Sequence, residues 1–179
     1  MDKIENFLNY ELQNKNEIPN IPLYIDQVTS YLEDVFSDLR LNDEDKVLTK
    51  TMINNYVKAQ VISSPIKKKY NKEQIMKLKM LYLLKNTLSL SQIDDLFQES
   101  DDLEALYDYF IACDGEGRAV LKKTSPATIS EKDIFKLLLS SQLQKKYAEL
   151  LLEQIKMSRA EEKQKKDKAD KKKKTDEVK

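Results

Sequence analysis

The residues best suited to chemistry in this sequence are lysines and side-chain amides gathered between positions 48 and 75. Residues 48–58 read LTKTMINNYVK, and residues 63–75 read SSPIKKKYNKEQI. Lysine binds phosphate oxygens and guanine, and asparagine can form a bidentate pair with adenine. Together these residue types are typical of a surface that binds nucleic acid.

The net charge of zero conceals a strongly uneven distribution of charge along the chain. Residues 1–48 carry a net charge of −7, residues 49–85 hold nine lysines against one acid, and residues 86–113 hold seven acids and no base. A short basic segment can neutralise phosphates and release their counterions. It can equally pair with the acidic blocks beside it, so charge alone supports both interpretations.

Residues 49–59 are predicted to form a helix with two different faces. At 100° per residue, Met52, Ile53, Tyr56 and Val57 share the apolar face. The opposite face has no carboxylate, whereas an ordinary solvated helix face usually includes Glu or Asp. That face consists of Lys50, Thr51, Asn54, Asn55 and Lys58. We expect it to contact DNA, and the alternative is a solvated surface.

The three lysines Lys67, Lys68 and Lys69 lie with Tyr70 at the end of residues 61–70, the only stretch with strand character. A recognition helix followed directly by a basic hairpin is the arrangement of a winged helix-turn-helix, whose wing contacts neighbouring phosphates. We therefore expect a short wing over residues 63–70. The alternative is a surface turn. Tyr56 and Tyr70 suit the core better than the surface.

The composition favours an all-α fold. Apolar residues make up 40% of the chain, with two glycines and four prolines, too few turn residues for a many-stranded sheet. Apolar periodicity and capping residues predict the helices. They cover residues 1–13, 23–39, 49–59, 71–85, a segment from about 89, 103–113 and 131–158. The sequence DGEG, at 114–117, is expected to end the sixth of them.

Four segments follow from this pattern. Residues 1–19 are an N-terminal amphipathic helix, and residues 20–98 the DNA-binding domain. Residues 99–158 form a C-terminal helical region for dimerisation or effector binding. Residues 159–179 form a charged tail, which is expected to be disordered or a fraying helical extension because it has few apolar residues to bury.

Several residue types that enzymes and metal sites use are missing. The chain has no histidine and one cysteine, Cys113, and it has no glycine-rich phosphate loop. Zinc binding and His-based catalysis therefore lack their usual groups. We expect a protein that is not an enzyme and has no cofactor. The apolar runs are too short to cross a membrane and the N-terminus lacks a signal-peptide core, so we expect a cytoplasmic location.

The order of these residues resembles the MerR-type winged-helix pattern. The resemblance lies in INNYVKAQVI, SPIKKKYNKEQIMKL and LSLSQI, within residues 20–97. The chain is more closely similar to a bacterial family of unknown function described as putative MerR-like DNA-binding proteins. By position, the arginine of the family's helix falls on Asn54 and its two tyrosines on Asn55 and Tyr56. The arginine and tyrosine of its wing fall on Lys68 and Tyr70.

The sequence departs from the family pattern at Gln60, which stands where the family has glycine. The wing is also short, and the first helix and its connection are longer than is typical.

This resemblance implies an all-α protein with a very short β wing, followed by C-terminal helices. It implies a sequence-specific transcriptional regulator that binds double-stranded DNA as a homodimer, because palindromic half-sites double the few contacts of one helix. The helices beyond Leu103, especially residues 131–158, are the candidates for the dimer contact. The alternative function is a helical protein–protein adaptor whose basic segment binds an acidic partner. An effector site between the C-terminal helices is a third hypothesis.

Overall fold

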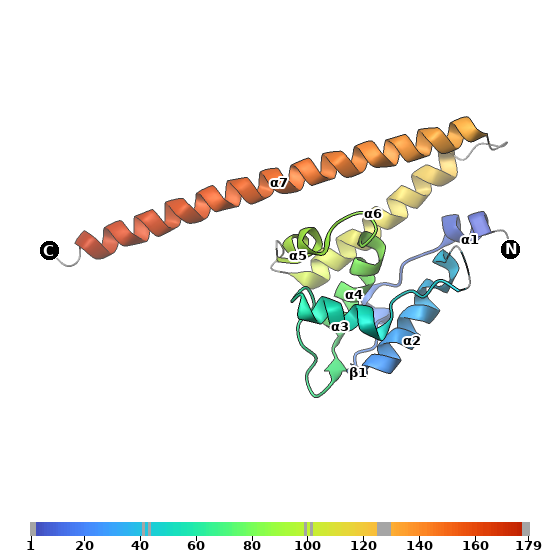
Figure 1. Ribbon diagram of the computed structural model, residues 1–179, viewed down its shortest axis with the longest axis horizontal. Coiled ribbons are helices and arrows are strands. Elements are labelled where there is room, and N and C mark those ends of the chain that lie inside the picture. The colour runs from blue at the N-terminus through green and yellow to red at the C-terminus, as the bar shows by residue number, and fades with distance from the viewer. Residues whose placement is uncertain are drawn as a thin grey trace. The chain divides into compact units, whose positions relative to one another are not determined.

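The computed structural model describes residues 3–40, 42, 44–98, 100, 102–124 and 130–176, with side chains as far as residue 161. The chain is mostly helical (Figure 1), which confirms the all-α prediction. The helices are α1 (Lys3–Asn9), α2 (Ile25–Phe36), α3 (Lys50–Lys58), α4 (Lys72–Leu84), α5 (Leu90–Gln98), α6 (Leu103–Thr124) and α7 (Glu131–Asp176). Two 3-10 turns, Lys15–Glu17 and Ser37–Leu39, and two strands, β1 (Leu23–Tyr24) and β2 (Lys69–Tyr70), complete the described elements.

The chain divides into two compact units. Residues 1–125 form the first, which contains α1 to α6 and the small sheet, and residues 126–179 form the second, which consists mainly of α7. The segments expected at 1–19 and 20–98 therefore lie in the same unit, together with α6. Residues 125–129 are outside the described part of the chain.

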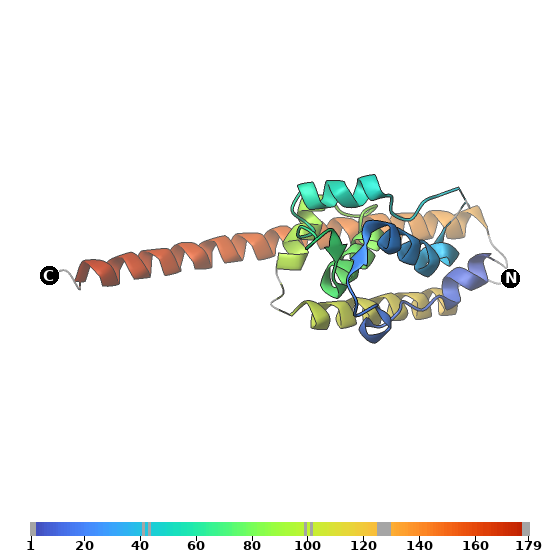
Figure 2. The same ribbon diagram turned by 90° about the horizontal axis from the view of Figure 1, so that it is seen from below.

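The core of the first unit is built around α4. In Figure 2, α3 and α6 lie on opposite sides of this unit, with α2 and α4 between them. Helix α4 is buried on most of its circumference, as expected of a helix that neighbours surround; its buried apolar side chains are Ile75, Met76, Leu78, Met80 and Leu81. Helix α2 buries a single stripe instead, formed by Val28, Leu32 and Phe36 at intervals of four residues. Helix α4 packs against α5 and α6, and its Tyr82 ring contacts Phe36 of α2. Helix α2 in turn packs against α3.

The helix starts follow the capping residues in the sequence. Thr49 Oγ1 accepts a hydrogen bond from Met52 N at 3.2 Å at the start of α3. Asn71 and Gln74 form a reciprocal capping box at the start of α4, with bonds of 2.8 and 2.9 Å. Ser89 and Gln92 repeat that box before α5. These caps satisfy backbone N–H groups that a helix leaves unpaired, which confirms the predicted starts.

The first two helices are shorter than predicted. Helix α1 ends at Asn9, because Leu12 leaves the helical path and is buried in the core. Helix α2 begins at Ile25 and not at Leu23, since Leu23 and Tyr24 pair as β1 with Tyr70 and Lys69 of β2. The periodicity of the apolar residues does not distinguish these extended pieces from helix.

The prediction that DGEG ends α6 is wrong. The helix continues through Gly115 and Gly117 to Thr124. Arg118, one turn after Asp114, donates to its carboxylate at 2.7 Å (Nε) and 3.1 Å (Nη2). The Arg118 guanidinium also donates to the Phe7 carbonyl and lies 4.8 Å from the centroid of the Phe7 ring. These contacts offset the cost of two glycines in a helix interior, about 1 kcal/mol each.

A buried lysine links the N-terminal segment to the core. Lys79 on α4 is 1% exposed, and its Nζ donates to Gln13 Oε1 at 3.2 Å. The Tyr31 hydroxyl donates to the same oxygen at 2.6 Å, and the Tyr107 hydroxyl donates to the Gln13 carbonyl at 2.9 Å. Burial lowers the pKa of Lys79 to about 8. This polar cluster fixes the extended segment after α1 against α2, α4 and α6.

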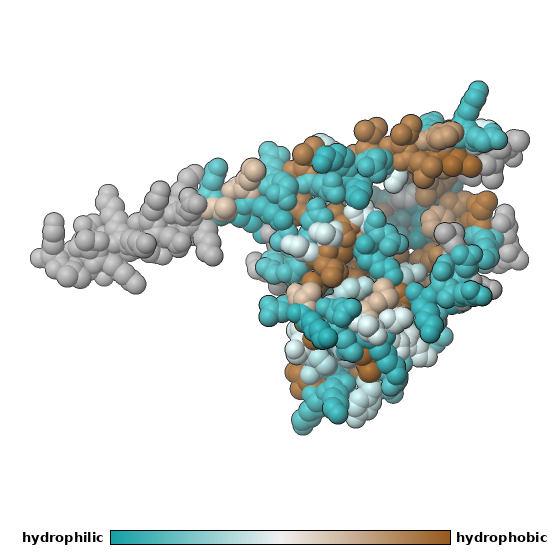
Figure 3. All heavy atoms as spheres, in the orientation of Figure 1, coloured by the Kyte–Doolittle hydropathy of each residue, from teal (hydrophilic) through white to brown (hydrophobic). Residues whose placement is uncertain are grey.

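Helix α7 begins after Ser130, whose N and Oγ both bond to Asp133 Oδ2. It runs to Asp176 and so continues past the predicted end at 158, into the segment where disorder or a fraying extension was expected. Many apolar side chains on it are exposed (Figure 3); they include Phe135, Leu138, Leu139, Leu143, Tyr147 and Leu150. Among the described residues, no helix combines the length and the apolar character that a bilayer span requires.

Candidate nucleic-acid interface

Helix α3 presents the predicted polar face to solvent. Ile53 and Tyr56 are buried, and they hold the other side of the helix against the core. The exposed side chains are Lys50, Thr51, Asn54, Asn55 and Lys58. The helical wheel therefore identified the exposed face correctly, and contact of this face with DNA stays a prediction.

The end of α3 has a left-handed residue where the resemblance placed a glycine. Gln60 has φ 63°. Its N–H donates to the Val57 carbonyl at 3.0 Å, and the Val61 N–H donates to the Tyr56 carbonyl at 3.1 Å. These two bonds form a Schellman motif, in which glycine is the usual left-handed residue. Gln60 thus adopts the backbone conformation that a glycine would supply, and the helix stops in the same way.

The lysine segment forms a tight two-residue hairpin. Ile66 and Lys69 form an antiparallel bridge, and the Lys69 N–H donates to the Ile66 carbonyl at 2.9 Å. Lys67 and Lys68 between them have φ 51° and 64°. Two successive residues with positive φ define the type I′ turn, for which Asn-Gly is strongly preferred. The hairpin therefore holds two exposed lysines in a conformation that disfavours their side chains.

The four contact residues predicted within the wing lie in different environments. Lys67 and Lys68 at the tip are exposed, whereas Lys69 is partly covered and its Nζ lies 4.8 Å from the centroid of the Tyr24 ring. Tyr70 is only 2% exposed, and its burial raises the pKa of its phenol. We therefore correct the expected set of contact residues: Tyr70 is a core residue and does not belong to the exposed surface.

The lysine hairpin and α3 lie side by side (Figures 1 and 2). Both therefore contribute to one region of the surface, and side chains of mainly hydrophilic character cover it in Figure 3. The strand β1 supports the hairpin through its pairing with β2. The sequence predicted that the helix and the lysines belong to one surface, but it did not identify β1 as the partner of β2.

One acid that the sequence interpretation missed lies at the edge of this region. Asp26, in the first turn of α2, forms an ion pair with Lys50 at the start of α3. Both side chains are more than half exposed, so the pair contributes at most about 1 kcal/mol to stability. The sequence gives no direct signal for this pair, because the two residues are on different helices.

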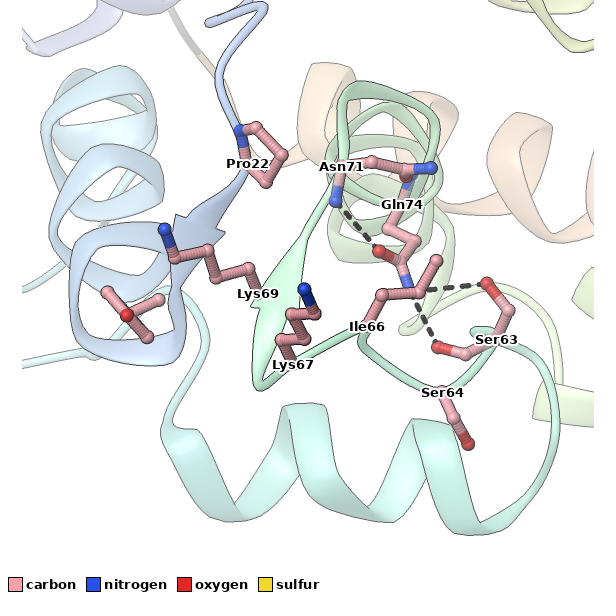
Figure 4. A pocket seen from close by; sticks show the side chains of 9 residues that line it. Pro22, Ser63, Ser64, Ile66, Lys67, Lys69, Asn71 and Gln74 are labelled. Carbon is pink, nitrogen blue, oxygen red and sulfur yellow. Dashed lines mark hydrogen bonds between the residues drawn. The ribbon is translucent and has the colours of Figure 1, made fainter.

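A groove of about 410 Å³ opens beside the hairpin (Figure 4). Lys67 and Lys69 line it from the hairpin, Ser63 and Ser64 from the loop after α3, and Gln74 from the first turn of α4. None of its lining residues is an acid. The groove can therefore accept an anion, and sequence reasoning gave no indication of it.

The comparisons with known proteins place the chain in a family. A family model described as a domain of unknown function (DUF1836) matches residues 13–110, more than half of the chain. The matched region includes α3, the lysine hairpin and the groove. No curated protein and no solved structure matches the chain. The expectation of an uncharacterised family is confirmed, and the chain belongs to the DUF1836 family.

Proposed function

We propose that this protein is a sequence-specific DNA-binding transcriptional regulator with a MerR-like winged helix-turn-helix in residues 20–98. In this proposal α3 enters the major groove of double-stranded DNA, and the lysine hairpin acts as the wing on adjacent phosphates. The protein acts by binding and not as an enzyme.

The observation that carries the proposal is the pair of lysines at the tip of the hairpin. A left-handed conformation costs an ordinary residue roughly 1–2 kcal/mol, and both Lys67 and Lys68 adopt it. Asn-Gly would form the same turn more favourably. Residues that violate a local rule of this kind are concentrated at functional sites. Two cations held at a turn tip beside an acid-free helix face suit contact with phosphates.

The α3 side chains supply the groups that base recognition needs. Asn54 and Asn55 present amides that can both donate to and accept from adenine, and Thr51 adds a hydroxyl. Lys58, at the last turn, can reach the backbone. The Lys50–Asp26 ion pair is weak enough to open when a phosphate competes for the lysine.

The proposal includes a homodimer in which α7 provides the contact. Its exposed apolar side chains extend over more than 20 residues, from Ile134 to Met157. A long helix with so much exposed apolar surface usually marks an interaction site. Two copies would double the base contacts at a palindromic site.

A second candidate function is a helical protein–protein adaptor. The observation that favours it is the Lys50–Asp26 pair, because it shows that a carboxylate can engage the basic face. An acidic partner would then replace Asp26, and α7 would bind a different protein.

A titration of labelled duplex DNA at several salt concentrations tests the proposal. Affinity should fall steeply with salt and should favour one sequence over random competitor. Lys68→Ala should weaken binding to all sequences and reduce the salt slope by about 1, whereas Asn54→Ala should cost about 1–3 kcal/mol on the preferred sequence alone. Lys123→Ala, an exposed lysine at the end of α6, is the control. If the Lys68 and Asn54 variants bind DNA as the control does, the adaptor is the better proposal.

A further inference from the structure

The groove beside the hairpin has walls from three parts of the chain (Figure 4). Pro22 and Tyr24 form one side, the hairpin residues Ile66, Lys67 and Lys69 another, and the loop with Ser63 and Ser64 closes it against the start of α4. Its volume of about 410 Å³ lies within the range of pockets that hold small molecules.

The groove is held in shape by hydrogen bonds that do not need a ligand. Gln74, which is 5% exposed, donates through Nε2 to the Ser63 carbonyl at 2.7 Å and to Ser63 Oγ at 3.2 Å. Its Oε1 accepts from Asn71 N at 2.8 Å. Figure 4 shows these bonds joining the loop to the start of α4. Because both the oxygen and the nitrogen of the Gln74 amide are hydrogen-bonded, the serine loop is held in position without a ligand.

The hairpin wall is fixed as well. Lys69 is paired with Tyr24 in the two-stranded sheet, and its Nζ lies over the ring of the same tyrosine. The bridge between Ile66 and Lys69 then fixes the direction of the tip, including Lys67. Little ordering of the backbone would be needed on binding, which lowers the cost of association.

The charges around the groove select an anion. Two lysines line it and no carboxylate does. Glu73, the acid in the first turn of α4, is not a lining residue. The N-terminal end of α4, where Asn71 and Gln74 lie, adds the positive end of a 13-residue helix dipole. The hydroxyl of Ser63, whose oxygen already accepts from Gln74, supplies a donor that suits a phosphate oxygen.

The remaining lining is apolar. Pro22, Ile66 and the ring of Tyr24 provide a surface against which a flat or aliphatic group can pack. A ligand that has a charged end and an apolar body therefore matches the lining better than a bare ion does. A terminal phosphate also fits a concave site more readily than a phosphodiester, whose two ester oxygens continue into a chain.

We propose that this groove is a binding site for the terminal phosphate of a small phosphate monoester. Lys67 neutralises the dianion, the Ser63 hydroxyl donates to its oxygens, and the organic group packs on Pro22 and Tyr24, where Lys69 covers part of the ring. The lining of the groove carries this proposal, which goes beyond contact with DNA and does not depend on it.

The test is a titration of the full chain, followed by the backbone amide resonances in NMR spectra at constant ionic strength. The probes are phenyl phosphate, inorganic phosphate and dimethyl phosphate, a stand-in for the DNA backbone. Phenyl phosphate should shift the amides of Ser64, Lys67, Lys69 and Asn71 in a saturable way. Inorganic phosphate should bind more weakly at the same amides. Dimethyl phosphate should give no saturable shift.

Lys67 and Lys68 provide a matched pair of variants. Both lysines have positive φ at the same turn, but only Lys67 lines the groove. Lys67→Gln should weaken phenyl phosphate binding about tenfold, as expected for loss of a charge-assisted bond, whereas Lys68→Gln should change it less than twofold. Equal effects of the two variants, or the absence of saturable shifts, would overturn the proposal. DNA contact predicts similar losses of DNA affinity for both variants, so the two proposals can fail separately.

Discussion

Helix α6 contains glycines where they lower stability, whereas the lysine hairpin lacks glycine where the backbone favours it. The two glycines of the chain, Gly115 and Gly117, lie in the interior of α6, where they lower stability. The left-handed positions of the chain, where glycine would be favoured, are occupied by Gln60, Lys67 and Lys68 among the described residues. The turn therefore retains two lysine side chains although glycine would make it more stable. The helix has no side chain at two positions where alanine would make it more stable. This difference indicates that the side chains at the hairpin matter more than the stability of the turn.

The largest effect is expected where α6 is stabilised despite its glycines. Arg118→Ala should lower the free energy of unfolding by about 3 kcal/mol, because it removes a buried charge and leaves Asp114 without its partner. Urea unfolding followed by circular dichroism measures this loss. Arg118→Lys keeps the positive charge and should lower the free energy of unfolding by less. If Arg118→Ala is neutral, the Arg118–Asp114 pair does not explain why the helix continues past DGEG.

The glycines of α6 can be replaced directly. The double variant Gly115→Ala/Gly117→Ala should raise the free energy of unfolding by about 2 kcal/mol, from about 1 kcal/mol per glycine. A Cβ at either position meets no atom within 4 Å, so no clash opposes the gain. Thermal unfolding of the variant and of the parent chain gives the difference. A loss of stability would show that these glycines are needed for a contact outside the described structure.

Replacing the two lysines at the tip of the hairpin should change both the stability of the protein and its affinity for DNA. Lys67→Asn/Lys68→Gly places the preferred residues in the type I′ turn and should raise the free energy of unfolding by roughly 1 kcal/mol. If the lysines bind phosphates as proposed, the same variant should lose DNA affinity. Urea unfolding and DNA titration of one preparation measure both. A more stable variant with unchanged affinity would remove the functional explanation of the strained lysines.

The smallest effect is expected at the end of α3. Gln60→Gly should stabilise the chain by about 0.5 kcal/mol, because relief of the left-handed strain is partly offset by the greater entropy of unfolded glycine. Gln60→Ala is the matched control and should give no such gain. Since Gln60 is outside the proposed contact set, DNA affinity should be unchanged in both variants. Melting temperatures resolve the difference if both variants are measured in parallel.

Local signals in the sequence predicted much of the first unit. Thr49, Asn71 and Ser89 are capping residues whose partners lie within three positions, so the predicted starts of α3, α4 and α5 are correct. The exposed face of α3 followed from spacing alone. Gln60 was noted only as a departure from the family's glycine, and its left-handed conformation was not predicted.

Features that depend on distant partners could not be predicted. Helix α6 continues past DGEG partly because Arg118 contacts Phe7, which is 111 positions away. The strands β1 and β2 have two residues each and pair across more than 40 positions, which is too short for a periodic signal. The groove arises only when β1, the hairpin and the start of α4 meet. Tyr70 was included in the contact set because of its neighbours, although the core was the favoured place for its side chain, and the structure buries it.

The buried amine of Lys79 has a consequence for chemical labelling. Its pKa of about 8 is a property of the buried amine, because opening of the cluster returns the amine to water and to the pKa of an ordinary lysine. The side chain is only 1% exposed, so an acylating reagent reaches it only when the Gln13 cluster opens. Its modification rate, compared with that of the exposed Lys68, therefore reports how often the N-terminal segment leaves the core. Lys79 is therefore an internal probe of local unfolding at the N-terminal segment.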